Sequence, residues 1–300
     1  MSNSVIVKFT KRGSALAVKD AAAANAVDTQ FHSKRAGKFV KKLMDESAKF
    51  KAVTSKLNEA YNWHKAVTMP FLDNGMRMLH VDKMDDYILQ TNKYKSEIQR
   101  LLLDLKPEWD NEIALDMQRL AGLGNVKDYP SWGEIEYKYS IDVKFLPVPE
   151  ASDFRFQVDQ DIVNELDNMK KQAKIEGRQE VFARVEKVVG VAIDQCTKSN
   201  PRIFDSMLGN MADLADVMKY LNIHDDPEMT VVAEKLKELS ESCTTFNLRN
   251  DEVIRKVLAS DCEAFISKLR NGNWYEIQEP EVVEVEVQAC QQNALADSLV

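Results

Sequence analysis

The sequence has little of what marks disulfide scaffolds, metal centres or membrane proteins. Its 300 residues include only four cysteines, and no two of them form a Cys-x-x-Cys pair. Free thiols in a reducing compartment are therefore the simplest interpretation. No run of about 18 apolar residues is present, and the first residues lack the apolar stretch of a signal peptide. We therefore expect a cytoplasmic protein, in a bacterial cell or a phage-infected host.

Motifs for catalysis and cofactor binding are also missing. The chain has no phosphate-binding glycine loop, no dinucleotide fingerprint and no His-Glu-x-x-His. The paired carboxylates Asp85-Asp86 and Asp225-Asp226 fall at predicted helix starts, where capping and the helix dipole explain them. The sequence thus predicts no catalytic residue, no metal site and no cofactor, and we expect a protein that is not an enzyme.

Glycine and proline are scarce, at 10 and 8 residues, which is typical of long helices joined by few turns. We predict a mainly α-helical fold with a long antiparallel helical hairpin, a C-terminal helical bundle and a small β-hairpin or ribbon inserted between them. The predicted segments are a flexible basic arm (1–32), the hairpin (33–121), an irregular β-prone insert (122–157), the bundle (158–272) and an acidic flexible tail (273–300).

Two apolar stripes predict the helical hairpin. The first begins after Ser33, and the second has a nearly heptad spacing that is typical of coiled coils. Pro70 is expected to end the first helix and Pro107 the second. The stripes comprise Phe39, Leu43, Phe50, Val53, Leu57, Ala60 and His64, and then Tyr87, Tyr94, Ile98, Leu101 and Leu105.

The insert is predicted from an alternation of apolar and polar residues between Ile135 and Phe145, which is the two-residue period of a strand. Within the bundle, Gly177 marks a break between helices. Asn200-Pro201, Asp226-Pro227 and Asn250 are the predicted helix starts.

Charge is distributed unevenly along the chain, although the net charge is −8. Residues 1–70 hold 13 Lys/Arg and 5 Asp/Glu, so residues 71–300 carry the acidic excess. A basic segment on an acidic body suits nucleic acid, an acidic protein or a neighbouring copy of the chain, while a solvated helix surface explains it without any partner.

Five short words occur in the same order as in an uncharacterised phage and bacterial family, domain of unknown function 3150, which the chain resembles over residues 35–270. The words are Phe71–Leu79, Asp128–Ser131, Phe145–Pro149, Asp153–Arg155 and Leu221–Pro227. The family has no established activity. The resemblance implies a role beside MoxR-type AAA+ ATPases, as an adaptor or co-chaperone.

Candidate binding residues come from these words. Asp73 and Arg77 have the spacing of an ion pair if their segment is helical. The other candidates are Tyr129, Pro130, Asp153, Phe154 and Arg155.

The leading hypothesis is a non-enzymatic protein that binds a protein partner, with an AAA+ ATPase as the candidate. One alternative is a self-assembling structural protein with charge-matched ends. The other is a nucleic-acid-binding accessory protein in phage replication or recombination. No membrane contact is expected.

Overall fold

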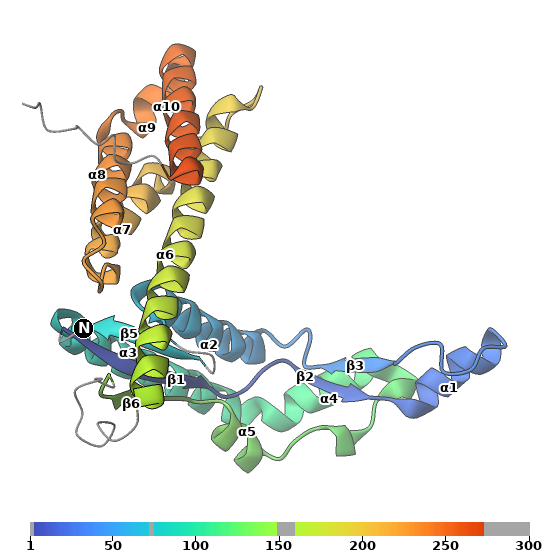
Figure 1. Ribbon diagram of the computed structural model, residues 1–300. Helices are drawn as coiled ribbons and strands as arrows, with labels where there is room; N and C mark the ends of the chain where they lie inside the picture. The colour runs from blue at the N-terminus through green and yellow to red at the C-terminus, as the bar shows by residue number, and fades with distance from the viewer. Residues whose placement is uncertain (1–2, 72–74, 149–159, 273–300) are drawn as a thin grey trace, which may run out of the picture.

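The computed structural model describes residues 3–71, 75–148 and 160–272, which form an L-shaped molecule (Figure 1). It is mostly helical with a small antiparallel sheet, so the predicted mainly helical class is confirmed. The acidic tail predicted at 273–300 lies outside the described residues.

A four-stranded antiparallel sheet lies at the corner of the L. Its order is β4 (Met69–Pro70), β5 (Met76–His80), β1 (Ser4–Lys11) and β6 (Ile141–Leu146). Because β1 pairs with both β5 and β6, the N-terminal segment is a central strand.

The prediction of a flexible arm at residues 1–32 is therefore wrong. Val7 is fully buried and opposes Arg77 on one side and Phe145 on the other. Ile6 and Val7 point to opposite faces of the sheet and belong to different apolar cores. The partners of β1 are distant in sequence, so no local pattern could indicate them.

Two long helices, α2 (Ala48–Val67) and α3 (Met84–Leu105), pack together and share a core with Val7, Phe9 and Leu79 of the sheet. Phe50, Val53, Leu57, Ala60 and His64 of the first predicted stripe and Tyr87, Tyr94, Ile98 and Leu105 of the second are buried. The first helix starts later than predicted, because Ser47 caps it. The connection between the helices contains β4 and β5.

The predicted β-hairpin insert is wrong in its first half. After α4 (Trp109–Leu120), which precedes the predicted insert, the chain forms two 3₁₀ turns (Ala121–Leu123 and Val126–Asp128) and α5 (Trp132–Lys138) before β6. Ser131 and Glu134 form a capping box that starts α5. Ile135 and Tyr139 are both buried, and their spacing of four suits a helix as well as a strand.

The rest of the chain is helical. It comprises α6 (Gln160–Thr197), α7 (Ser206–Leu221), α8 (Pro227–Glu241), α9 (Thr245–Asn250) and α10 (Glu252–Asn271). Asp226-Pro227 starts α8 as predicted, because the Asp226 carboxylate accepts a bond from the Glu228 amide. The other two starts are wrong: α7 begins at Ser206 rather than beside Asn200-Pro201, and Asp251 rather than Asn250 caps α10.

Helix α6 joins the two limbs of the L. It is continuous through Gly177, where the sequence predicted a break. A Cβ at Gly177 would lie 2.3 Å from the Cε of Met69 in β4. The glycine therefore allows α6 to lie against the sheet, and the core formed by α6, α7, α8 and α10 includes Ile6, Met69 and Met78.

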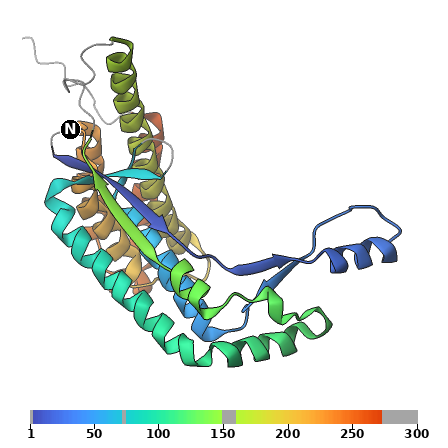
Figure 2. The same cartoon turned by 90° about the horizontal axis from the view of Figure 1, so that it is seen from below.

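A separate two-stranded ribbon extends from the sheet. It consists of β2 (Leu16–Lys19) and β3 (Val40–Leu43), with α1 (Ala21–Gln30) between them. We call residues 15–44 the arm. Seen from below, α1 and the loop that follows it project beyond the rest of the molecule (Figure 2). Helix α1 has no buried residue.

Candidate functional site: the basic arm

Arg77 is buried at the joint between the sheet and α6, where it has a structural role. Its Nε donates to Thr68 Oγ1 at 2.8 Å, and its Nη2 donates to the Thr68 carbonyl at 2.6 Å and to Glu180 at 2.7 Å. Burial opposes ionisation of Glu180, but bonds from Arg77 and Arg184 outweigh it and lower the pKa of Glu180. The expected ion pair with Asp73 required a helix, whereas Arg77 lies on β5; Asp73 lies outside the described residues.

Tyr129 and Pro130 also hold the fold together. The Tyr129 hydroxyl donates to Asp116 at 2.7 Å, and the Pro130 carbonyl accepts a bond from Trp109 Nε1 at 3.3 Å. Burial of Tyr129 raises its pKa, as does the bond to Asp116. The hydroxyl therefore remains a donor to a buried carboxylate.

The other three candidates, Asp153, Phe154 and Arg155, lie outside the described residues. The seven predicted residues are therefore not brought together among the described parts of the chain. The three that are described, Arg77, Tyr129 and Pro130, connect elements of the body, by which we mean the described residues outside the arm.

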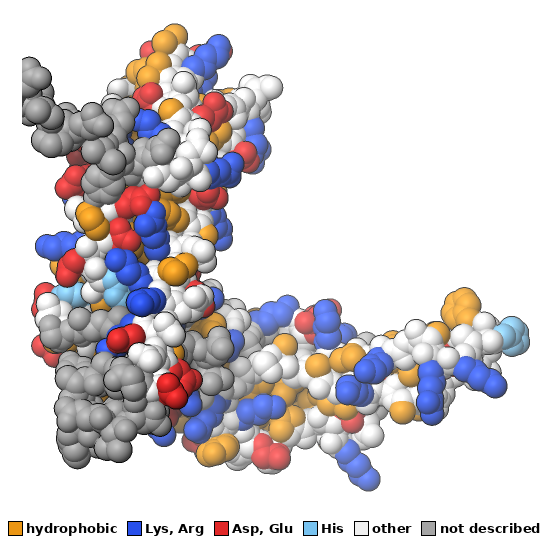
Figure 3. Space-filling view, in the orientation of Figure 1, with side chains coloured by type: hydrophobic (Ala, Val, Ile, Leu, Met, Phe, Trp, Pro, Cys, Tyr) orange, Lys and Arg blue, Asp and Glu red, His pale blue; other side chains and the backbone are white. Residues whose placement is uncertain are grey.

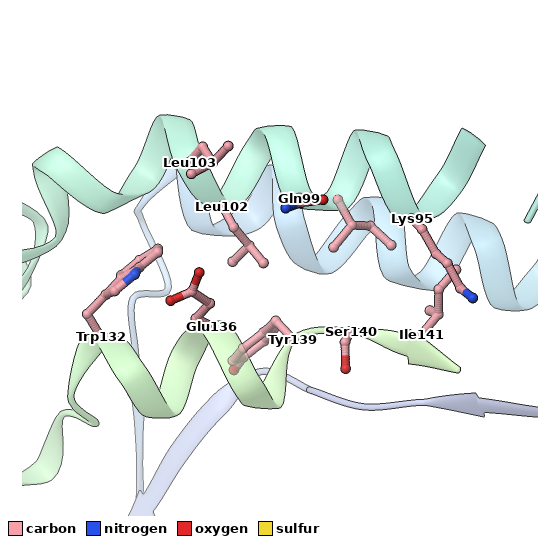
Figure 4. Close-up of a pocket in the computed structure, with 10 residues that line it drawn as sticks. Lys95, Gln99, Leu102, Leu103, Trp132, Glu136, Tyr139, Ser140 and Ile141 are labelled. Atoms are coloured by element: carbon pink, nitrogen blue, oxygen red, sulfur yellow. The ribbon is translucent and has the colours of Figure 1, made fainter. Parts of the chain in front are cut away.

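A groove of about 240 Å³ runs between α3 and α5 (Figure 4). Lys95 lies at one end, and Trp132 and Glu136 lie at the other. Trp132 Nε1 is buried and has no hydrogen-bond partner among the described residues. The ionisable side chains of this lining are Lys95, Glu136 and Tyr139, and burial raises the pKa of Tyr139 to about 12. The groove can admit one side chain, but it lacks an evident acid–base pair.

A second cleft, of about 500 Å³, lies between the end of β5 and helices α7 and α8. Several of its polar groups contact one another or their neighbours. Lys237 pairs with Asp216 at 2.9 Å, and the ring of Tyr220 contacts His80 edge-on and has the ammonium of Lys83 at 4.3 Å. These contacts leave the cleft without an obvious reactive centre.

The arm is anchored at its base by Lys41 of β3, which is only 6% exposed. Its ammonium lies 2.9 Å from Asp20 and 2.6 Å from Asp128, and it donates to the Leu123 carbonyl at 3.0 Å. Bonds to Asp128 and Asp20 raise the pKa of Lys41. Because Asp128 belongs to the body, these ion pairs fix the ribbon to it.

The ribbon has one packed face and one open face. Leu16 and Leu43 are buried on the packed face, with Lys41. The opposite face carries Ala17 and Lys19 of β2 and Val40 and Lys42 of β3, all exposed. Ala17 pairs with Lys42 and Lys19 pairs with Val40, so the two lysines lie diagonally across the ribbon.

The tip of the arm is organised by Asp28. Its carboxylate accepts bonds from Ser33 Oγ at 2.8 Å and from the amides of Arg35 at 2.6 Å and Ala36 at 3.2 Å. These bonds, led by the one from Ser33, lower the pKa of Asp28. They hold a loop in which Arg35 has a positive φ of 53°, a conformation that few residues adopt without support. Phe31, beside this loop, is 70% exposed.

Charge on the arm is one-sided. It contains six Lys/Arg and two Asp, and both aspartates are bonded within the arm as described above. Among the described residues, the five remaining bases have no carboxylate within ion-pair distance, and all five are exposed. Figure 3 shows Lys and Arg side chains spaced along the projecting limb. The five are Lys19, Lys34, Arg35, Lys38 and Lys42.

Comparisons with known proteins give no match. Neither a family model, nor a curated protein, nor a solved structure is similar to the chain. The part of the chain that the structure describes contains no group of three or more His, Cys, Asp or Glu that could bind a metal, and none of its helices is long and apolar enough to span a membrane. The arm is therefore the best-defined candidate site, on the strength of its shape and charge.

The sequence contained part of this signal. The excess of Lys/Arg in residues 1–70 indicated a basic segment, and the bases between Lys34 and Lys42 are not interrupted by an acid. What the sequence did not show is that Lys41 is buried while its neighbours are exposed, nor that two distant aspartates neutralise it.

Proposed function

We propose that this chain is a non-enzymatic binding protein that contacts an acidic macromolecular partner through the arm. The observation that supports this proposal is the contrast within the arm: its acids are used in internal bonds, whereas five exposed bases remain without an acidic partner among the described residues. Surface charge of one sign accelerates association with an oppositely charged partner. Lys41 fixes the foot of the arm to the rest of the molecule, so this charge is held in a defined place.

The partner implied by the family resemblance is a MoxR-type AAA+ ATPase. Co-expression, pull-down and measurement of the ATPase rate test this assignment. The arm variant for this experiment is K34E/R35E/K38E. Its three substitutions lie on exposed side chains, so we expect the circular dichroism spectrum and the melting temperature to stay close to those of the wild type.

A matched control variant is K93E/K187E/K268E. It has the same change in net charge, and its three lysines are exposed on α3, α6 and α10. Loss of the complex in the arm variant but not in the control variant supports contact through the arm. Equal retention in both variants contradicts it, and absence of a complex with the wild type contradicts the choice of partner.

Self-assembly is the second candidate, because residues 71–300 carry the acidic excess that an arm from another copy could contact. Such contacts weaken as salt screens the charges. Light scattering of the wild type and the arm variant across a salt series distinguishes this candidate. A wild type that is monomeric at every salt concentration rules it out.

A further inference from the structure

We infer that the partner of the arm is nucleic acid, with the five exposed Lys/Arg side chains contacting the sugar-phosphate backbone and Phe31 stacking on a nucleobase. This inference rests on the proposed function, that the arm is the binding site, and adds the chemical class of the partner. Three features of the arm support it: the width of the ribbon, the placement of its bases and the aromatic side chain near its tip.

The ribbon has the dimensions of elements that enter a nucleic-acid groove. A two-stranded β-ribbon or one α-helix fits the major groove of duplex DNA, which is about 12 Å wide. β2 and β3 form such a ribbon without a third strand, and α1 continues it for 10 residues, or about 15 Å. No residue of α1 is buried and seven of its ten residues are exposed, so most of its surface is open to a partner.

The exposed Lys/Arg side chains lie on parts of the arm that a nucleic-acid groove would surround. Lys19 and Lys42 lie diagonally on the open face of the ribbon. Lys34, Arg35 and Lys38 lie on the loop beyond α1. Phosphates follow the edges of a groove at regular intervals, so Lys/Arg side chains spread from the ribbon to the tip of the arm can contact several of them together. The bonds to Asp28 fix the loop before binding and so reduce the entropy lost on contact.

Phe31 supplies the third feature. Its ring is 70% exposed and directly precedes the basic loop. Proteins that bind single strands combine Lys/Arg side chains with aromatic rings on which nucleobases stack. Several duplex-binding proteins insert an apolar side chain between neighbouring base pairs. An exposed aromatic ring among Lys/Arg side chains that have no acidic partner in the described residues fits either single-stranded or duplex nucleic acid.

An acidic protein fits the arm less well. Protein interfaces usually contain an apolar core that becomes fully buried. The arm exposes three large apolar side chains, Val27, Phe31 and Val40, and its other exposed apolar residues are alanines. The acidic excess of residues 71–300 would repel phosphates, which disfavours contact with nucleic acid over that part of the chain.

Fluorescence anisotropy with labelled oligonucleotides tests the inference on the full chain. The probes are a single-stranded DNA of about 30 nucleotides, the corresponding duplex, a single-stranded RNA and polyglutamate of similar charge. If all five bases contact phosphates, log K against log [salt] has a slope of about −3.5 on single strands and about −4.5 on duplex. The arm variant should bind more than about tenfold more weakly than the control variant and show a slope smaller by about 2 or 3.

Replacement of the aromatic ring separates stacking from charge. F31A should bind single strands about tenfold more weakly without a change in the salt slope. The matched control is F246A, because Phe246 of α9 is equally exposed, at 71%, and lies outside the arm. A loss on single strands alone identifies an unpaired strand as the ligand, and an equal loss on duplex identifies insertion between base pairs.

Several outcomes overturn the inference. One is binding of the arm variant that equals that of the control variant. Another is the absence of binding to every nucleic acid at about 50 mM salt. If polyglutamate binds as tightly as the oligonucleotides and only the arm variant loses it, the arm is a binding site for acidic proteins: the inference fails and the proposed function stands. If no probe binds and the arm variant behaves as wild type in the ATPase and self-association assays, both fail.

Discussion

Lowering the pH from about 8 to about 5 should destabilise the folded protein, because the unfolded chain then binds a proton at His64 that the folded protein does not bind. His64 of α2 is 1% exposed, its Nδ1 lies 2.8 Å from the Tyr87 hydroxyl, and its ring stacks on Phe9 with centroids 4.7 Å apart. Burial, together with the nearby Arg77, lowers the pKa of His64 from 6.5 to about 3, although Glu180 acts in the opposite direction. The folded protein therefore keeps this ring neutral over a range in which the unfolded chain binds a proton.

The sign and size of the effect follow from this difference. Between pH 6.5 and about pH 3 the unfolded state binds one more proton at His64 than the folded state, so stability falls as the pH falls through this window. Going from about pH 8 to about pH 5 should cost roughly 2 kcal/mol at this residue alone, with 1.36 kcal/mol per pKa unit. Above pH 8 the contribution is fully present.

Urea unfolding followed by tryptophan fluorescence measures this loss. Trp63, Trp109 and Trp132 all belong to or contact the core that contains Tyr87, so the signal reports on that part of the molecule. The comparison variant is H64Q, which removes the titrating group and keeps a polar side chain beside the Tyr87 hydroxyl.

The difference in the free energy of unfolding between about pH 8 and about pH 5 should be smaller by roughly 2 kcal/mol in H64Q than in the wild type. Burial also lowers the pKa of His224. Because His224 is present in both proteins, its contribution to the pH dependence cancels in the comparison. Equal pH dependence in the two proteins would refute the assignment, whatever their absolute stabilities.

Three further changes test the joint and the arm. R77A should lower the free energy of unfolding by about 2 kcal/mol, because it removes the buried bonds to Thr68 and leaves the half-buried Glu180 with Arg184 as its remaining guanidinium partner; chemical denaturation measures it. G177A should destabilise the protein by about 1 kcal/mol through the contact with the buried methionine of β4, whereas G190A in open space on the same helix should stabilise it by up to about 1 kcal/mol; a reversed order contradicts the packing. K41M should lower the melting temperature and accelerate hydrogen exchange in β2 and β3, and unchanged exchange would show that the ion pairs do not anchor the arm.

The helices of the body could be predicted where their signals are local. The apolar stripes of α2 and α3 were identified because a buried face repeats every three or four residues. The start of α8 was identified because Asp226 caps it and Pro227 occupies the first turn. Asn200-Pro201 carries the same signal but starts no helix. Buried Ile203 and its carbonyl, which accepts a bond from Arg249 at 3.1 Å, hold that segment in place before α7 begins.

The sheet and the arm could not be predicted, because they depend on contacts between distant residues. β1 resembles an isolated β-prone segment until it is paired with β5 and β6. Lys41 looks like its exposed neighbour Lys42 until Asp20 and Asp128 are placed beside it. Some local signals were missed: the capping box of Ser131 and Glu134 that starts α5, and the caps Ser47 and Asp251 that start α2 and α10.

The central position of β1 has a consequence for biosynthesis. β1 precedes both of its hydrogen-bonding partners in the sequence: β5 ends at His80 and β6 ends at Leu146, and α6, which packs on the same sheet, continues to Thr197. The contact order of this sheet is therefore high, and the edge of β1 that pairs with β6 stays unpaired until residue 146 has been synthesised, even when β5 has paired with the other edge. A nascent chain that stalls between His80 and Leu146 would therefore expose the edge of β1 that β6 covers in the folded protein.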